Sequence, residues 1–221
     1  MLIKICGITN VDDAKFALEA GADWIGLNLV GGPRRIDLAT LADITSKLPD
    51  VSRVVVLIRL SGNRVKPSLL SDLRRHGITR LQLYGEASAA TFEHLAWEGF
   101  ASILAQSVSN VDALDELSAM LTACGEHKPD HILLDAGTPD QLGGSGRCLD
   151  WERLGKERSA GRFDDWPPIL LAGGLTPANV AEAIRQTNPA GVDVSSGVEA
   201  KPGRKDHAKV EAFVQAVRRT Q

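Results

Sequence analysis

Short apolar runs alternate with amphipathic stretches along the whole 221-residue chain. Runs rich in Val, Ile and Leu favour strands, and apolar residues that recur every three to four positions favour helices. The pattern predicts strands over 2–5, 23–30, 51–60, 78–84, 101–108, 130–136, 168–174 and 191–197. It predicts helices over 10–22, 37–48, 66–77, 88–99, 110–125, 149–158, 176–187 and 205–220.

Strict alternation of strand and helix predicts parallel strands joined by crossover helices. Eight such units in 221 residues favour closure into a (β/α)8 TIM barrel, an α/β fold that would occupy residues 1–221 as a single domain. An open doubly wound sheet is the alternative. A Gly-x-Gly-x-x-Gly motif after the first strand would favour that sheet, and the sequence has none there.

Composition narrows the class of protein. The net charge of −3 gives no reason to expect nucleic acid or a membrane surface as a partner. No apolar run approaches the roughly 20 residues of a membrane helix, and no charged-then-apolar leader precedes the first strand. The three cysteines, Cys6, Cys124 and Cys148, have no metal-ligand spacing and form no paired framework. We therefore expect a cytoplasmic protein without a metal site.

In a barrel the active site lies at the carboxyl ends of the strands. This rule turns the sequence into a short list of candidates. The residues at the expected strand ends are Cys6, Asn28, Arg34, Arg59, Tyr84, Gln106, Asp135, Gly173, Gly174, Ser195, Ser196 and Gly197.

Two glycine-bearing segments, 172–180 and 192–198, follow the seventh and eighth predicted strands. In barrels these two loops commonly build a phosphate site. Glycines let backbone N–H groups approach a phosphate closely, and a helix N-terminus near Thr176 or Ser196 would add a favourable dipole. Two ordinary tight turns are the alternative reading. The positions of the two loops favour a phosphorylated small molecule as the ligand.

Cys6 and Asp135 would face each other across the mouth of the barrel. A free thiol has a pKa of about 8.5, which positive neighbours lower, and Lys4 shares the face of Cys6 because side chains alternate along a strand. Asp135 could equally be a helix cap or a solvated loop residue. A base and an acid in this arrangement suit proton-transfer isomerisation of a phosphorylated sugar derivative. Arg34 is either a bidentate partner for a ligand anion or a surface arginine.

Several segments together resemble a known family. "KICGITNVDDAKFALEAGAD", "LQLYGE", "LLDA", "GGSGRCLDW", "LAGGLTPANV" and "GVDVSSGVE" are similar to the motifs of the phosphoribosylanthranilate isomerases, the TrpF enzymes of tryptophan biosynthesis. The resemblance runs from residue 2 to about residue 216. It implies a (β/α)8 barrel and a cofactor-free Amadori rearrangement. In that reaction N-(5'-phosphoribosyl)anthranilate becomes 1-(o-carboxyphenylamino)-1-deoxyribulose 5-phosphate.

The resemblance also implies roles for individual residues. Asp135 would be the general acid that protonates the ribose ring oxygen, and Cys6 the general base that removes the C2' proton. Arg34 would lie near the anthranilate carboxylate. Gly7 would leave space beside the thiolate. The residues that match the phosphate-binding loops are Gly173, Gly174, Ser195, Ser196 and Gly197.

Some positions depart from the family pattern. Tyr84 stands where histidine is usual, Arg59 where asparagine is usual, and "GLNLV" lacks the usual phenylalanines. Arg59 would suit a more acidic substrate or lower the pKa of Cys6. Two alternatives therefore stay open: a paralogue acting on a different phosphoribosyl-amine, and a non-catalytic barrel that binds a phosphate ligand. The protein is expected to be a monomer or a homodimer, and loop 137–148 is the expected lid.

Overall fold

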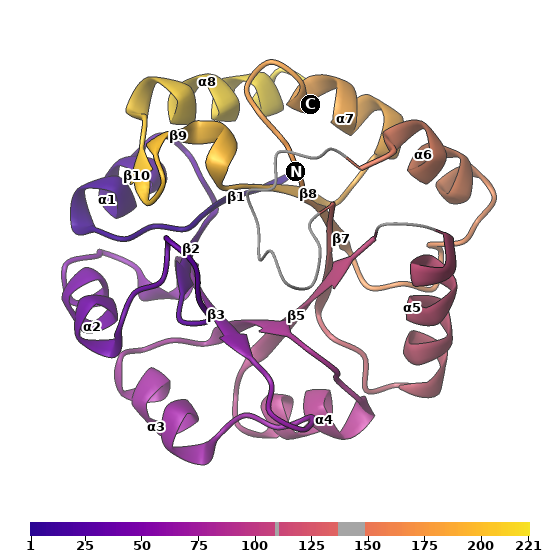
Figure 1. Ribbon diagram of the computed structural model, residues 1–221, viewed down its shortest axis with the longest axis horizontal. Coiled ribbons are helices and arrows are strands. Elements are labelled where there is room, and N and C mark those ends of the chain that lie inside the picture. The colour runs from indigo at the N-terminus through magenta and orange to yellow at the C-terminus, as the bar shows by residue number, and fades with distance from the viewer. Residues whose placement is uncertain (109–110, 137–148) are drawn as a thin grey trace.

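The computed structural model describes residues 1–108, 111–136 and 149–221. Within them, eight parallel strands form a closed barrel in the order β1 to β8, and α-helices ring it on the outside (Figure 1). The barrel strands are β1 (Leu2–Cys6), β2 (Trp24–Asn28), β3 (Val54–Arg59), β4 (Arg80–Tyr84), β5 (Ala101–Ser107), β6 (His131–Asp135), β7 (Ile169–Leu171) and β8 (Gly191–Val194). The prediction of a (β/α)8 barrel is confirmed.

The helices follow the strands in the predicted alternation. They are α1 (Val11–Glu19), α2 (Leu38–Ser46), α3 (Pro67–Arg75), α4 (Ala89–Trp97), α5 (Val111–Ala123), α6 (Trp151–Ser159), α7 (Val180–Thr187) and α8 (His207–Arg218), with short 3-10 turns η1 (Val51–Arg53) and η2 (Ser196–Val198). None of the helices in the described ranges is both long and apolar enough to cross a bilayer.

Pairing of the first and last strands closes the barrel. β1 pairs with β8, where Lys4 lies in register with Asp193, and with β2, where Cys6 lies in register with Gly26. Parallel strands place all their carboxyl ends at one rim. Closure therefore brings residues from opposite ends of the sequence to the same face of the molecule.

Two apolar clusters stabilise this arrangement. The larger one lies between the strands and the helices, and includes Ile3, Ile5 and Phe213, all fully buried. The smaller one groups alternate strand residues, including Val55 and Leu133. Side chains alternate across a strand, so the second cluster fills the barrel interior and leaves the carboxyl rim for polar groups.

The Asn10 side chain caps the start of α1. The Asn10 side chain accepts a hydrogen bond from Asp13 N at 2.9 Å, which satisfies one of the otherwise unpaired N–H groups of the first turn. The helix ends at Glu19, and Gly21 follows with φ of +103°. Glycine suits this left-handed position because it has no side chain to clash.

Two features near the rim differ from the expectation. Helix α7 begins at Val180 rather than at Thr176, and the Asn179 side chain accepts from Thr176 N at 2.7 Å in the turn before it. Strands β9 (Glu199–Lys201) and β10 (Arg204–Lys205) form an antiparallel hairpin where the sequence pattern predicts no regular structure. The hairpin lies beside α1 and α8 (Figure 1).

The cysteines other than Cys6 lie away from the rim or outside the described residues. Cys124 is 5% exposed and packs in the outer core, directly after the end of α5. Cys148 and the expected lid, 137–148, lie outside the described residues.

Candidate active site

A cavity opens at the carboxyl ends of the strands. It holds about 540 Å³ of space outside the protein atoms, including open solvent at its mouth. Its walls come from the ends of β1, β2, β3, β4, β6, β7 and β8 and the loops that follow them. The lining residues are Cys6, Gly7, Asn28, Arg34, Leu57, Tyr84, Asp135, Ala172, Gly173, Gly174, Leu175, Asp193, Val194, Ser195, Ser196 and Gly197.

The structure brings most of the sequence-predicted residues into this one cavity. Cys6, Asp135, Arg34 and both glycine-bearing loops line it, as do Asn28 and Tyr84. Arg59 and Gln106 are not among its lining residues, and Arg59 is exposed at the end of β3. Arg59 therefore lies at the carboxyl end of β3 but outside the wall of the described cavity.

Cys6 is 7% exposed, at the end of β1. Burial raises the pKa of its thiol above the ordinary value; Lys4 opposes this rise, Asp193 adds to it, and Lys205 opposes it. The net result is a raised pKa, so the thiol is mainly protonated at neutral pH. The cations that favour the thiolate are Lys4 and Lys205 rather than Arg59.

The thiol owes its space to Gly26 rather than to Gly7. A Cβ atom at Gly26 would lie 2.7 Å from Cys6 Sγ. A Cβ at Gly7 would lie 2.5 Å from Arg34 Cδ and 2.8 Å from Ser195 Oγ, and Gly7 also has φ of +76°. The space beside Gly7 therefore holds the stem of Arg34, which corrects the expectation that it accommodates the thiolate.

Asp135 lies at the end of β6, across the cavity from β1. Gly173 approaches it closely: a Cβ at Gly173 would lie 3.1 Å from Asp135 Oδ1 and 2.6 Å from Ala136 N. The absence of a side chain at Gly173 therefore gives the carboxyl group room at the cavity wall.

The two glycine-bearing loops present polar groups to the cavity. In the described part of the chain, the backbone N–H groups of Gly173, Ser196 and Gly197 have no protein acceptor. The buried Ser195 Oγ also lacks a hydrogen-bond partner there. A Cβ at Gly197 would lie 1.9 Å from Leu175 O, so the loops can pack together only with glycine at this position. Donors in such a concave arrangement suit an anion.

Arg34 is held by a residue that sequence reasoning missed. Its Nε donates to Glu199 Oε1 at 2.8 Å, and its Nη2 donates to Glu199 Oε2 at 2.7 Å. Arg34 is 9% exposed and Glu199 is 7% exposed. The guanidinium is therefore neither a free surface group nor loosely placed.

Tyr84 carries a neutral hydroxyl at the cavity wall. Its Oη accepts a hydrogen bond from Gln82 Nε2 at 2.7 Å. Burial raises the pKa of Tyr84 well above its ordinary value, and the neighbouring Cys6, Asp193 and Asp135 raise it further. The hydroxyl therefore keeps its proton and can donate it in a hydrogen bond.

Sequence signals existed for some of the missed residues. Pro202-Gly203 is a typical turn pair between two short polar segments, which predicts a hairpin and would have drawn attention to Glu199 and Lys205. A glycine within a strand, such as Gly26, often marks a close approach of another group. No local signal identifies Asp193 as the partner of Lys4, because the two residues pair only after the barrel closes.

Comparison with known proteins gives one consistent family. A family model described as "N-(5'phosphoribosyl)anthranilate (PRA) isomerase" matches residues 3–216. The N-(5'-phosphoribosyl)anthranilate isomerase of Magnetococcus marinus is 40% identical over 220 residues, covering 99% of this chain and 96% of the relative.

Solved structures agree with the sequence relatives. The phosphoribosyl anthranilate isomerase of Thermotoga maritima is 33% identical, with a TM-score of 0.82 and 99% of each chain covered. A phosphoribosyl anthranilate isomerase in complex with reduced 1-(o-carboxyphenylamino)-1-deoxyribulose 5-phosphate is 29% identical, with a TM-score of 0.79, covering 99% of this chain and 98% of that chain. These matches span nearly the whole chain and confirm the resemblance seen in the motifs. The chain belongs to the N-(5'-phosphoribosyl)anthranilate isomerase family.

Proposed function

We propose that Cys6 and Asp135 are the general base and the general acid of this chain's isomerase reaction. The reaction is the Amadori rearrangement of N-(5'-phosphoribosyl)anthranilate to 1-(o-carboxyphenylamino)-1-deoxyribulose 5-phosphate, a step of tryptophan biosynthesis. The observation that carries the residue assignment is that a thiol from β1 and a carboxyl group from β6 line one cavity.

The chemistry needs one proton donor and one proton acceptor. Asp135 protonates the ribose ring oxygen, the bond from C1' to that oxygen breaks, and a Schiff base forms with the anthranilate nitrogen. Cys6, as the thiolate, then removes the C2' proton and leaves an enolamine. The enolamine becomes the 2-ketone when C1' gains a proton and the C2' hydroxyl group loses one. Each transfer requires a side chain within hydrogen-bond reach of the reacting atom.

The rest of the cavity fits the two anionic ends of this substrate. The loops after β7 and β8 supply the phosphate site through Gly173, Gly174 and the segment 195–197, which are its predicted residues. Arg34 supplies the guanidinium for the anthranilate carboxylate. Burial keeps such charge-assisted bonds strong.

Three further expectations stay predictions. Residues 1–221 form one domain, the protein is a monomer or a homodimer in solution, and it works in the cytoplasm. A phosphorylated small molecule is the proposed ligand, with no nucleic acid or membrane as a partner.

The test is a fluorescence assay of the purified protein with freshly generated N-(5'-phosphoribosyl)anthranilate. Enzymatic loss of anthranilate fluorescence is the expected result. A second phosphoribosyl-amine, assayed in parallel, separates this activity from that of a paralogue. If neither compound is turned over while a phosphoribosyl-amine analogue binds tightly, the protein is a binding barrel and the proposal fails.

A further inference from the structure

We propose that Glu199 is a positioning residue that presents Arg34 to the substrate carboxylate and so makes the site selective for carboxylated arylamines. This inference rests on the proposed function above, in which Arg34 binds the anthranilate carboxylate. Glu199 lies outside the cavity lining, on the β9–β10 hairpin.

The Glu199 carboxylate fixes the plane of the Arg34 guanidinium. Two parallel hydrogen bonds, of 2.8 Å from Nε and 2.7 Å from Nη2, join the two groups. Such a bidentate pair restricts both the position and the orientation of the guanidinium. The side chains of Arg34 and Glu199 are 11% and 4% exposed, so solvent competes little for the bonds.

The stem of Arg34 is restricted as well. It passes over Gly7, where a Cβ would come within 2.5 Å of Arg34 Cδ. The head of the side chain is thus held by Glu199 and its stem lies in a groove that only glycine leaves open. An arginine held in this way does not have to lose rotamer freedom when the ligand binds, and that saving favours affinity.

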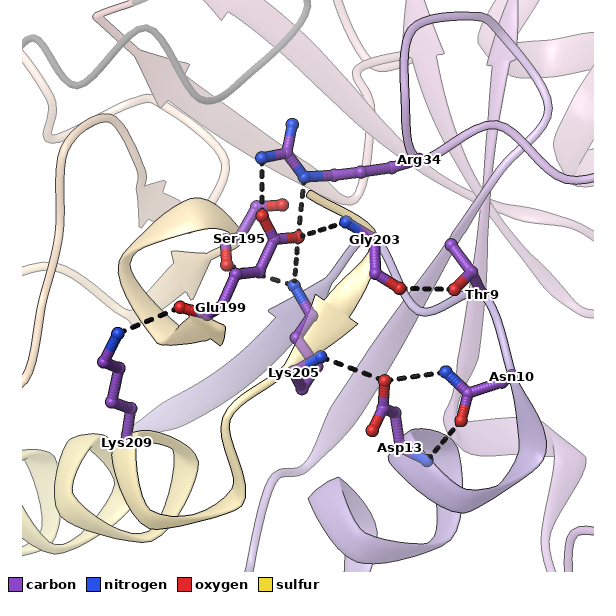
Figure 2. A network of polar contacts seen from close by, with 9 residues as sticks. All are labelled: Thr9, Asn10, Asp13, Arg34, Ser195, Glu199, Gly203, Lys205 and Lys209. Carbon is purple, nitrogen blue, oxygen red and sulfur yellow. Dashed lines mark hydrogen bonds and ion pairs between the residues drawn. The ribbon is translucent and has the colours of Figure 1, made fainter. Parts of the chain in front are cut away.

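Glu199 is itself anchored from several elements (Figure 2). Its Oε1 accepts from Lys205 Nζ at 3.1 Å and from Gly203 N at 3.3 Å. Its backbone oxygen accepts from Lys209 Nζ of α8 at 2.9 Å. Gly203 O in turn accepts from Thr9 Oγ1 at 2.5 Å. The hairpin is therefore attached to the loop after β1 and to α8, and it is a firm support for the arginine.

One nitrogen of Arg34 stays available for the ligand. Glu199 uses Nε and Nη2, and no acceptor for Nη1 exists among the described residues. Arg34 lines the cavity, and its charge persists because arginine does not lose its proton in proteins. The ion pair with Glu199 therefore holds Arg34 Nη1 in a fixed place, where it can donate to a substrate carboxylate.

The experiment compares two substrates in the Glu199→Asp variant. Aspartate keeps the charge beside Lys205 but is one methylene shorter, so it cannot reach both Arg34 nitrogens from the same backbone position. The substrates are N-(5'-phosphoribosyl)anthranilate and the corresponding aniline compound, which lacks the carboxylate. We expect the ratio of their kcat/KM values to fall about tenfold or more, the effect of one lost charged hydrogen bond. The value for the aniline compound should stay close to that of the wild type.

A matched control separates positioning from general support of the hairpin. Lys209→Met removes the contact to the Glu199 backbone oxygen and leaves the carboxylate in place. This variant should keep the wild-type ratio. An equal loss on both substrates in Glu199→Asp would mean that Glu199 has only a structural role, and an unchanged ratio would mean that it does not position Arg34. Either result overturns the inference while wild-type turnover of the anthranilate compound still supports the proposed function.

A second measurement needs no variant. Nitrogen-15 relaxation of the Arg34 Nε–H group in the ligand-free wild-type protein should indicate a rigid side chain, with little change on adding the reduced product analogue. A guanidinium that is mobile without ligand and becomes ordered only on binding would overturn the inference.

Discussion

Lys4 Nζ lies 2.7 Å from Asp193 Oδ1 in the barrel interior, two positions before Cys6 on the same face of β1. The side chains of Lys4 and Asp193 are 0% and 9% exposed. The pair acts on the thiol with opposite signs, since Lys4 lowers the pKa of Cys6 and Asp193 raises it. Burial is the largest influence, and the pKa of Cys6 is raised overall.

The wild-type pH profile should reflect this raised pKa. The base form of Cys6 is the thiolate, and a raised pKa means that the thiolate fraction grows only as pH increases above neutrality. We expect kcat/KM to rise through the alkaline range, because kcat/KM reports the ionisation of the free enzyme. Initial rates across buffers of constant ionic strength check this. A kcat/KM that falls from pH 7 to pH 9 would be inconsistent with a thiolate base.

Replacing Lys4 and replacing Asp193 should shift the pH profile of kcat/KM in opposite directions. Lys4→Met removes the cation that favours the thiolate, so the alkaline rise should shift to higher pH by about one unit or more. Asp193→Asn removes a repelling charge, so the rise should shift to lower pH. Shifts of the same sign would rule out the electrostatic account of the thiol.

Lys4→Met should also destabilise the fold. It leaves the Asp193 carboxylate buried without its partner, which typically costs about 3–5 kcal/mol. Chemical denaturation of the variant measures this cost and shows whether the pH profile comes from folded protein. Asp193→Asn keeps a hydrogen-bond acceptor for Lys4 and serves as the milder member of the pair.

Gly26→Ala tests whether the space for the thiol matters. The new Cβ would lie 2.7 Å from Cys6 Sγ and displace it. A misplacement of about 1 Å at a reacting group can cost about 100-fold in rate, while overpacking costs about 1–3 kcal/mol of stability. Gly31→Ala is the control, because a Cβ there meets no atom within 4 Å. Equal activity of the two variants would remove the role assigned to Gly26.

Acid stability should depend on Glu199. Burial alone would raise the pKa of this carboxyl group, but its bonds to Arg34 and Lys205 outweigh burial and lower it. A lowered folded pKa contributes stability above the unfolded pKa, and that stability disappears as pH falls through the folded value. Glu199→Gln should therefore lose about 3–5 kcal/mol at pH 7, and the difference from wild type should shrink below about pH 4.

The exposed residue Glu182, which pairs with Arg185, is the control for that comparison. Glu182→Gln should leave the denaturation midpoint unchanged at both pH values, because exposed ion pairs contribute little. A Glu199→Gln variant as stable as Glu182→Gln at pH 7 would contradict the stabilising role of the buried pair.

The fold could be predicted because each strand and each helix has its own characteristic pattern of apolar residues. The tip positions of Cys6 and Asp135 follow from the same pattern, since a barrel gathers its strand ends at one rim. The residues that support the site, such as Lys4 and Asp193, could not be predicted from local sequence. Lys4 and Asp193 lie 189 positions apart and meet only when β1 pairs with β8.

The start of α7 was predicted too early. The segment before it is compatible with a helix by composition, but the regular helix begins at Val180. The apolar period shows which side chains face the core and does not fix the first helical residue, so this boundary could not be predicted from it.

The most direct test of the account compares wild type, Cys6→Ala and Asp135→Asn in one assay. Turnover of N-(5'-phosphoribosyl)anthranilate is measured together with the affinity for the reduced product analogue. The account predicts that each variant loses at least about 100-fold in kcat, the contribution of a general acid or base, while the analogue still binds within a few-fold of wild type. Wild-type turnover in either variant would contradict the assignment of that residue.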